Sequence, residues 1–472
     1  MIADLKPYAD YKDSGLPWLG QVPQHWEVRR IKTALRELDR RSSEGLEPLL
    51  SLRMQAGLVD HHALGGRPIP PSALIGSKRV LPGEIVMNRM RASSGLFAAA
   101  TSDGLVSPDY AIFRPVDQVN VAYAVQLFRT PAMMAVFRLE STGLGTGESG
   151  FLRLYSDQFG RLAIPIPPIA EQAAIMRFLD WASSRLERTI RAKRKVIALL
   201  TEQQQAVIHR AVTRGLDPGI ALKPSGIPWL GDIPQHWELR RLRQVAFMKP
   251  SKSESEDVLR RNGAVTFLPM ERVSAGGAVD ASERVHAATV WNGFTYFSRG
   301  DVIVAKITPC FENGKGAFLE NLPTDIGFGS TEFHVMRPSP WLLGAYLRLI
   351  TSSKQFLANG INSMTGSAGQ QRVPTDFVKN YLIALPSVEE QRAILESVNA
   401  CASRINAVVA RLNREIDLLR EYRTRLIADV VMGKLDVREA AARMPEDAPP
   451  NTTAGLNDES DDAEVADEEA EA

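Results

Sequence analysis

Two stretches of the chain place polar and charged side chains directly after short apolar runs. In double-stranded DNA, Arg or Lys can address guanine, Asn can address adenine, and Glu can address cytosine. Such side chains are candidates for reading bases from loops that enter a groove. They are Asn88, Arg89, Arg91 and Ser93 in the first stretch, and Lys306, Thr308, Glu312, Asn313 and Lys315 in the second.

Two glycine-rich segments, residues 143–153 and residues 365–372, offer further contacts because their backbone can approach a ligand closely. For any single residue, a solvated loop charge is an equal interpretation. The prediction therefore concerns the segments more than the individual side chains. The candidate hydrogen-bonding residues in these segments are Arg153, Gln370, Gln371 and Arg372.

The residue patterns of three enzyme classes are missing from the sequence. It has neither the Gly-rich cofactor loop nor the Asn/Asp-Pro-Pro-aromatic site of a methyltransferase that acts on an amino nitrogen. It also lacks the nucleotide-binding pattern Gly-x4-Gly-Lys-Ser/Thr, and Asp301 and Lys306 are too loosely spaced for a metal-dependent nuclease. Cys310 and Cys401 lie far apart, which argues against a zinc site and a disulfide framework. We predict no catalytic residue, metal or cofactor.

The net charge of +1 conceals an uneven distribution. Residues 445–472 contain eleven Asp or Glu and no Lys or Arg, and their composition predicts a disordered acidic tail. In residues 1–444, 56 Lys and Arg then face 44 Asp and Glu, a balance suited to a polyanionic partner. We find no secretion signal and no apolar stretch of membrane-spanning length, so we expect a cytoplasmic protein without membrane contact.

A long internal repeat organises the chain. Ser14–Arg30 recurs as Ser225–Arg241. The exchanges between the copies are conservative except at one position, where the neutral Gln21 corresponds to the acidic Asp232. Later landmarks keep nearly the same offset, since residues 82–86 match 299–303 and residues 113–115 match 336–338. The chain therefore consists of two related halves. Within the repeat we interpret Trp18, Trp26, Trp229, Trp237, His25 and His236 as packing residues, and not as base-stacking or catalytic groups.

Each half closes with a long segment that lacks Pro and Gly, which predicts helices over residues 171–214 and 389–432. Apolar residues follow coiled-coil spacing, broken at Glu415 in the second helix and at Thr189, Lys193 and Gln203 in the first. Equal lengths favour mutual pairing; the alternative is two helices packed on separate cores. The predicted seam comprises Ile175, Leu179, Ala182, Leu186, Val196, Leu200 and Val207, and Ile394, Val398, Cys401, Ile405, Val408, Leu412, Leu419, Tyr422 and Leu426.

Short apolar runs between motif and helix predict strands. We expect an α+β fold with two pseudo-repeated target-recognition domains joined by two long helices in an antiparallel coiled coil. Two diverged readers held apart by a helical spacer suit an asymmetric, bipartite DNA site. The expected boundaries are 1–167 for the first domain, 168–214 for the first spacer helix, 215–386 for the second domain, 387–433 for the second spacer helix and 445–472 for the tail.

The tandem Ser-Gly-x-Pro-Trp-Leu-Gly-x-x-Pro-x-x-Trp-Glu motif, the Pro-x-x-x-Glu-Gln segments at Pro167 and Pro386, and the long helices resemble type I restriction-modification specificity subunits. The resemblance covers residues 10–440 and leaves the acidic tail outside. It implies a non-catalytic subunit that binds double-stranded DNA. Its implied partners are methyltransferase subunits, expected in two copies, and restriction/translocase subunits, which carry the chemistry. A coiled-coil scaffold that binds proteins remains the alternative, because charge and repeat fit both.

Overall fold

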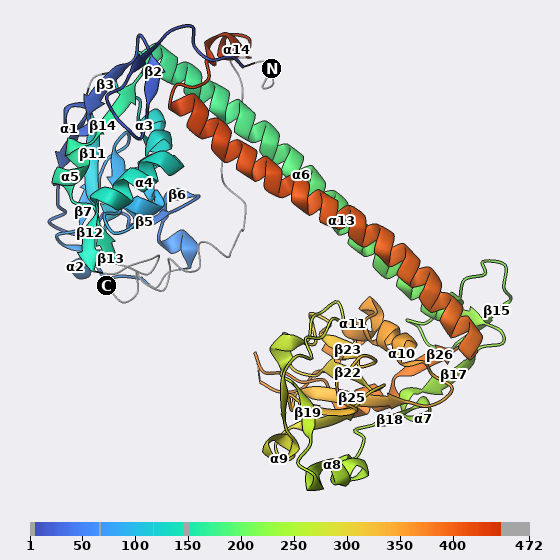
Figure 1. Ribbon diagram of the computed structural model, residues 1–472. Coiled ribbons are helices and arrows are strands. Elements are labelled where there is room, and N and C mark those ends of the chain that lie inside the picture. Colours follow the sequence, from blue (N-terminus) through green and yellow to red (C-terminus); the bar gives the residue numbers. More distant parts are fainter. Residues whose placement is uncertain (1–4, 66–67, 117, 145–150, 368, 445–472) are drawn as a thin grey trace. The chain divides into compact units, whose positions relative to one another are not determined.

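The computed structural model describes residues 5–65, 68–116, 118–144, 151–367 and 369–444. The predicted acidic tail, residues 445–472, lies outside the described residues. The chain divides into two compact units, one formed by Met1–Lys193 with Arg414–Ala472 and the other by Arg194–Asn413. Two long helices, α6 (Ile169–Arg214) and α13 (Val388–Val431), each contribute to both units (Figure 1). The predicted α+β fold with two long helices is confirmed.

The first unit contains two larger groups of strands and, in addition, the antiparallel pairs β1–β2, β3–β14 and β12–β13. One group is a four-stranded antiparallel sheet in the order β4-β11-β8-β9, and the other group joins the pairs β5–β6 and β7–β10 through a parallel bridge between Leu49 and Leu105. The strands are β1 (Tyr11–Asp13), β2 (Gln21–Pro23), β3 (Glu27–Arg30), β4 (Leu35–Leu38), β5 (Leu50–Arg53), β6 (Gly57–Asp60), β7 (Lys78–Val80), β8 (Ile85–Met87), β9 (Phe97–Ala99), β10 (Gly104–Val106), β11 (Ala111–Pro115), β12 (Thr142–Leu144), β13 (Phe151–Arg153) and β14 (Ala163–Ile166). The shorter helices are α1 (Ile31–Ala34), α2 (Pro71–Leu74), α3 (Val121–Phe128), α4 (Pro131–Glu140), α5 (Ser156–Arg161) and α14 (Arg438–Ala442).

The second unit repeats this topology. Its sheet β18-β25-β22-β23 matches β4-β11-β8-β9 strand for strand, and a second sheet has the order β20-β19-β24-β21 with β19 and β24 parallel. The strands are β15 (Leu222–Pro224), β16 (Asp232–Pro234), β17 (Glu238–Arg241), β18 (Ala246–Met248), β19 (Ala264–Leu268), β20 (Arg284–His286), β21 (Thr295–Ser298), β22 (Val302–Ala305), β23 (Gly316–Phe318), β24 (Ile326–Gly329), β25 (Phe333–Pro338) and β26 (Leu382–Leu385). The helices are α7 (Leu242–Val245), α8 (Glu256–Arg260), α9 (Ala287–Val290), α10 (Gly344–Thr351), α11 (Lys354–Asn362) and α12 (Thr375–Asn380).

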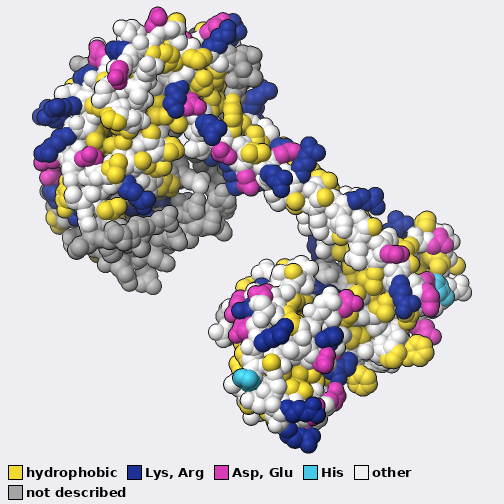
Figure 2. Space-filling model, viewed as in Figure 1, with side chains coloured by type: hydrophobic (Ala, Val, Ile, Leu, Met, Phe, Trp, Pro, Cys, Tyr) yellow, Lys and Arg dark blue, Asp and Glu magenta, His cyan; other side chains and the backbone are white. Residues whose placement is uncertain are grey.

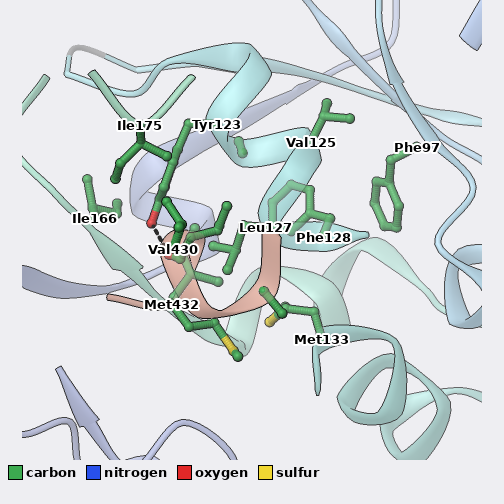
Figure 3. Close-up of a cluster of buried hydrophobic side chains, with 14 of the residues drawn as sticks. Phe97, Tyr123, Val125, Leu127, Phe128, Met133, Ile166, Ile175, Val430 and Met432 are labelled. Atoms are coloured by element: carbon green, nitrogen blue, oxygen red, sulfur yellow. Dashed lines mark hydrogen bonds between the residues drawn. The ribbon is translucent and has the colours of Figure 1, made fainter. Parts of the chain in front are cut away.

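The core of the first unit combines residues from both ends of the chain. Val430 and Met432, at the end of α13, lie among Tyr123, Leu127 and other buried side chains (Figure 3). The Tyr123 hydroxyl donates a hydrogen bond to the Val431 carbonyl at 3.0 Å. Beyond α13, Asp436 forms a β-bridge with Lys6, and the Arg438 guanidinium lies 5.1 Å from the Tyr8 ring centre. The C-terminal part of α13 and the segment after it therefore complete this core.

A buried glutamine fixes the start of each long helix. Gln172 donates through Nε2 to the carbonyls of Pro167 (2.7 Å) and Gln118 (2.8 Å), and its Oε1 accepts from the Asn120 amide at 2.7 Å. Gln391 makes the equivalent bonds to Pro386 (3.1 Å), Trp341 (2.8 Å) and the Leu343 amide (2.8 Å). In both units the glutamine thus ties the helix to the segment that precedes α3 or α10.

The neighbouring glutamate binds the repeated His-Trp pair. Glu171 accepts hydrogen bonds from Trp26 Nε1 at 2.9 Å and the Tyr8 hydroxyl at 2.7 Å, and its second oxygen lies 2.7 Å from His25 Nε2.

In the second unit, Glu390 lies 2.8 Å from His236 Nε2 and accepts from Trp237 Nε1 at 3.3 Å. Trp26 and Trp237 are buried, while Trp18 and Trp229 pack against the two cores. The interpretation of the repeated Trp residues as packing groups is confirmed, whereas His25 and His236 are exposed and are held by their contacts with Glu171 and Glu390.

Two of the four residues that interrupt the predicted seam, Lys193 and Glu415, face each other. Lys193 Nζ lies 2.5 Å from Glu415 Oε2, and Arg423 Nη1 lies 3.3 Å from Glu187 Oε2. Residue numbers increase along α6 in the direction in which they decrease along α13. The two helices therefore run antiparallel in the first unit. A polar pair inside an apolar seam favours one register, because a shifted register would leave both charges unpaired.

Parts of the predicted seam are wrong. Val196, Val408 and Tyr422 are exposed, and Ile190, Ile208 and Ile416 are buried instead. A straight α-helix drifts by about 20° per heptad relative to a strict seven-residue repeat, so the buried stripe moves to a neighbouring residue. Of the other predicted positions, Ile175, Leu179, Ala182, Leu186, Ile394, Val398, Ile405 and Leu426 are buried, and Leu200, Val207, Cys401, Leu412 and Leu419 are half-buried.

Replacing the buried glutamine tests the helix-start arrangement. Gln172→Ala should destabilise the protein by about 1–3 kcal/mol, because buried backbone groups lose their partners. The control is Gln203→Ala, an exposed position on the same helix, which should stay within about 0.5 kcal/mol of the wild type. Urea unfolding measures both, and equal midpoints for the two variants would contradict the assigned role.

The glutamate at the start of α13 should make stability depend on pH. Burial opposes ionisation of Glu390, but hydrogen bonds from His236 and Trp237 outweigh it and lower the pKa of this carboxyl. A lowered pKa in the folded state stabilises the protein above the unfolded pKa, and that contribution is lost as the pH falls. Between about pH 5 and pH 3, thermal melting of the wild type should therefore fall more steeply than that of Glu390→Gln. Glu396→Gln, at an exposed position of the same helix, is the matched control.

Candidate nucleic-acid interface

We call the sheets β4-β11-β8-β9 and β18-β25-β22-β23 the central sheets of the two units. A carboxylate–arginine pair lies at one end of each. Glu84, directly before β8, accepts from Arg114 of β11 at 3.0 Å, and it also pairs with Arg40. Asp301, directly before β22, accepts from Arg337 of β25 at 2.8 Å. The repeated landmarks at residues 82–86 and 299–303 are therefore bonded to the repeated Arg-Pro landmarks. This pairing was not predicted, although the two motifs recur together in the sequence.

At the opposite end of β22, the predicted segments of the second half meet. The Lys306 amide donates to the Glu332 carbonyl at 2.9 Å, and the Val373 amide donates to the Lys306 carbonyl at 2.8 Å. The Thr308 amide donates to the Gln371 carbonyl at 3.0 Å, and the Thr308 hydroxyl accepts from the Gln371 amide at 3.2 Å. Two segments about sixty residues apart thus form one surface.

Glu332 is the central charge of this surface. Its carboxylate accepts from Nε and Nη2 of Arg372, at 3.0 and 2.9 Å, and lies 3.9 Å from Lys306 Nζ. The hydrogen bonds from Arg372 lower the pKa of Glu332, and the same contact raises the pKa of Arg372. We call Lys306, Glu332 and Arg372 the second strand-end cluster.

The first unit has an equivalent arrangement after β8. The Leu154 amide donates to the Arg89 carbonyl at 2.9 Å, as Val373 does to Lys306. Arg153, the residue before Leu154, pairs with Asp109 and lies 5.5 Å from the ring centre of Tyr155. We call Arg89, Asp109 and Arg153 the first strand-end cluster.

The side chain of Arg89 is held on the adjoining surface. Its Nη2 donates to Glu37 at 3.0 Å and to Ser156 at 3.1 Å. The backbone contact of Arg89 with Leu154, together with these side-chain contacts, joins the end of β8 to the residues after β13.

Asp109 and Glu332 are equivalent residues. The amide of each donates to a serine hydroxyl two positions earlier, Ser107 at 3.3 Å and Ser330 at 3.2 Å. Each carboxylate pairs with the arginine that precedes a buried apolar residue, Leu154 or Val373. Neither was among the predicted site residues. The sequence does contain a pattern that marks them, because Ser-x-Asp/Glu-aromatic occurs at residues 107–110 and again at residues 330–333.

The remaining predicted residues are placed differently. Asn88 accepts through Oδ1 from the amides of Met90 (2.9 Å) and Arg91 (3.2 Å), so it shapes its own turn. Lys315 donates to the Met270 carbonyl at 3.3 Å. Arg91 and Ser93 are half-buried in the turn after β8, whereas Glu312, Asn313 and Gln370 are exposed. Residues 145–150 of the first glycine-rich segment lie outside the described residues.

Charges of both signs are interspersed on the visible face of each unit (Figure 2). In the described part of the chain, no group of three or more His, Cys, Asp or Glu residues is arranged to hold a metal ion. None of the helices in the described ranges combines the length and apolar character needed to cross a membrane.

The sequence has relatives among type I restriction enzyme specificity subunits, although no family model matches it. It is 39% identical over 168 residues to the EcoAI specificity subunit of Escherichia coli, a match covering 35% of this chain and 28% of that protein. The chain thus matches little more than a quarter of that subunit's length. The putative MjaX specificity subunit of Methanocaldococcus jannaschii is 20% identical over 435 residues, covering 89% of this chain and 96% of that one.

Solved structures show the same fold. A chain from a structure of a type I R-M system, described for its assembly and conformational transition, has a TM-score of 0.63 at 14% identity, covering 88% of this chain and 99% of that one. The HsdS subunit from Thermoanaerobacter tengcongensis has a TM-score of 0.51 at 15% identity, covering 88% and 98%. In sequence and in fold, this chain is a relative of the type I restriction enzyme specificity subunits.

Proposed function

We propose that this chain is the DNA-recognition subunit of a type I restriction-modification complex. The observation that carries the proposal is the presence of one strand-end cluster in each half, built from equivalent residues beside the equivalent strands β8 and β22 and β11 and β25. A protein that reads two half-sites needs two such surfaces. The specificity subunits among its relatives support the same assignment.

The target of the proposed subunit is asymmetric and bipartite. The loops beside the two clusters carry different side chains, with Asn88, Arg91 and Ser93 in the first unit and Thr308, Glu312 and Asn313 in the second. Different side chains address different base edges, so the two half-sites differ. We assign residues 1–167 and 215–386 as the recognition domains and residues 168–214 and 387–433 as the spacer helices.

We propose that base and phosphate contacts come from the strand-end clusters and their neighbouring loops. The sequence candidates retained for this role are Asn88, Arg89, Arg91, Ser93, Arg153, Lys306, Thr308, Glu312, Asn313, Lys315, Gln370, Gln371 and Arg372. The internal ion pairs of Arg89 and Arg372 make these residues weaker phosphate ligands than unpaired cations would be.

Methyltransferase and restriction/translocase subunits supply the chemistry in this proposal. In the first unit a hollow of 540 Å³ runs along the two helices, with Leu418 and Tyr422 exposed at its edge. Its other lining residues include Lys193, Glu415 and Arg425. Exposed apolar side chains beside charged ones suit a protein partner, and we place a methyltransferase contact there.

Mapping methylated adenines tests the proposal directly. When the chain is co-expressed with the methyltransferase and nuclease subunits encoded beside it, the host genome should acquire methylation at a split motif. One methylated adenine should lie in each half, on opposite strands. Expression of the partners without this chain is the control and should leave no such motif. If the full complex assembles and methylates DNA without sequence preference, the recognition role is wrong.

Salt dependence separates DNA recognition from a protein scaffold. Phosphate contacts release counterions, so binding of the assembled complex to a duplex carrying the mapped motif should weaken steeply with salt. Six phosphate contacts correspond to a loss of roughly a thousandfold between about 50 and 200 mM salt. Fluorescence anisotropy at several salt concentrations measures the slope. An assembled complex without salt-sensitive duplex binding would favour the scaffold.

A further inference from the structure

Both strand-end clusters contain a carboxylate on the surface that we assign to DNA. Asp109 and Glu332 are partly exposed, and a negative charge there repels phosphates. Even so, the same acidic position occurs in both halves, with the same serine contact and the same arginine partner. The recurrence of this carboxylate–arginine pair indicates that the carboxylate fixes the position of an arginine whose function depends on its orientation.

The hydrogen bonds of Arg372 leave a defined part of its guanidinium available. A guanidinium has five N–H donors. Nε and Nη2 donate to Glu332, and Nη1 donates to the Gln370 carbonyl at 3.3 Å. Among the described residues, these contacts leave one N–H on each terminal nitrogen. A bidentate arginine contact with O6 and N7 of guanine in the major groove uses one N–H of each terminal nitrogen.

Arg153 is held by different contacts with the same effect. Asp109 binds its Nη2, and the guanidinium carbon lies 5.5 Å from the ring centre of Tyr155. An aromatic ring fixes the plane of a guanidinium by cation–π attraction, while the carboxylate fixes its direction. Each arginine is thus oriented by two separate contacts.

The paired carboxylate favours a base over a phosphate as the ligand. An arginine already neutralised by Asp or Glu attracts a phosphate weakly, and the carboxylate repels it. The guanine edge is uncharged and is recognised by directed hydrogen bonds, which gain from a guanidinium held in place beforehand. Lys306 lies at the longer distance of 3.9 Å from the same carboxylate, and we assign it to the phosphate backbone.

We propose that Arg153 and Arg372 each read a guanine in the major groove, one in each half of the target, and that Asp109 and Glu332 position them. This inference rests on the proposed function and adds the identity of one base in each half-site. Asp109 and Glu332 are positioning residues, since they act through the arginines.

Selection from randomised duplexes tests this assignment. The full chain, assembled with its methyltransferase subunits, is incubated with the duplex pool, and bound sequences are read. Wild type should select a split motif with a guanine in each half. Arg372→Lys keeps the charge but loses the planar pair of N–H groups. It should therefore lose preference for one guanine by roughly 5- to 150-fold, the range for one bidentate contact, and leave the other half unchanged. Arg153→Lys should do the same in the other half.

Variants of the two carboxylates should give a different result from the arginine variants. Glu332→Gln should weaken the preference for the same guanine position as Arg372→Lys. It should also raise the affinity for unrelated duplexes, because a negative charge is removed. Asp109→Asn should act likewise on the other half. A merely structural role would lower binding to all sequences together and would not link each carboxylate to one base position.

The control is Arg299→Lys. Arg299 lies before β22, at the opposite end of this strand from Lys306, and pairs with Asp325 at 3.1 Å. This variant should keep the wild-type motif, and thermal melting checks that every variant is folded. A wild-type motif without guanine in one half overturns the inference for that half. Uniform weakening in both Lys variants would identify phosphate contacts and overturn it entirely. No sequence selection by wild type would refute the proposed function itself.

Discussion

The glutamate at the start of each long helix is the contact on which the rest of the arrangement depends. It joins the tandem His-Trp motif to the helix, and the glutamine beside it joins the helix to the segment before α3 or α10. Each long helix is therefore held to its unit by polar groups that have specific partners. The halves differ here, since the Tyr8 hydroxyl adds a donor to Glu171, whose side chain is 5% exposed against 36% for Glu390.

The two ends of each central sheet use ion pairs for different purposes. At one end the carboxylates of Glu84 and Asp301 are buried, and their arginines link β8 to β11 and β22 to β25. At the other end Asp109 and Glu332 are 36% and 23% exposed, and their arginines stay within reach of solvent. A site held on rigid strands keeps its geometry better than one carried by free loops.

The sequence was sufficient to predict features that depend on local pattern or on repetition. The long helices, the tandem motif and the strands all follow from spacing, whereas the DNA-binding role of the loop segments stays a prediction. The partners of Glu84 and Glu332 could not be read in this way, because each lies more than twenty residues away and is brought close only by strand pairing. The seam failed at Val408 because a fixed heptad cannot follow the drift of a straight helix. In the sequence, Lys193 and Glu415 each interrupt an apolar seam, and only the pairing of the helices brings them together.

The bridge between Lys6 and Asp436 has a consequence for synthesis on the ribosome. The first unit takes core residues such as Val430, Val431 and Val437 from the far end of the polypeptide, whereas the second is a continuous stretch. At about 5–20 residues per second, the N-terminal half waits many seconds for its missing partners to emerge. The later-translated half can therefore finish folding before the earlier one, and during that interval the N-terminal half presents an incomplete apolar core to chaperones.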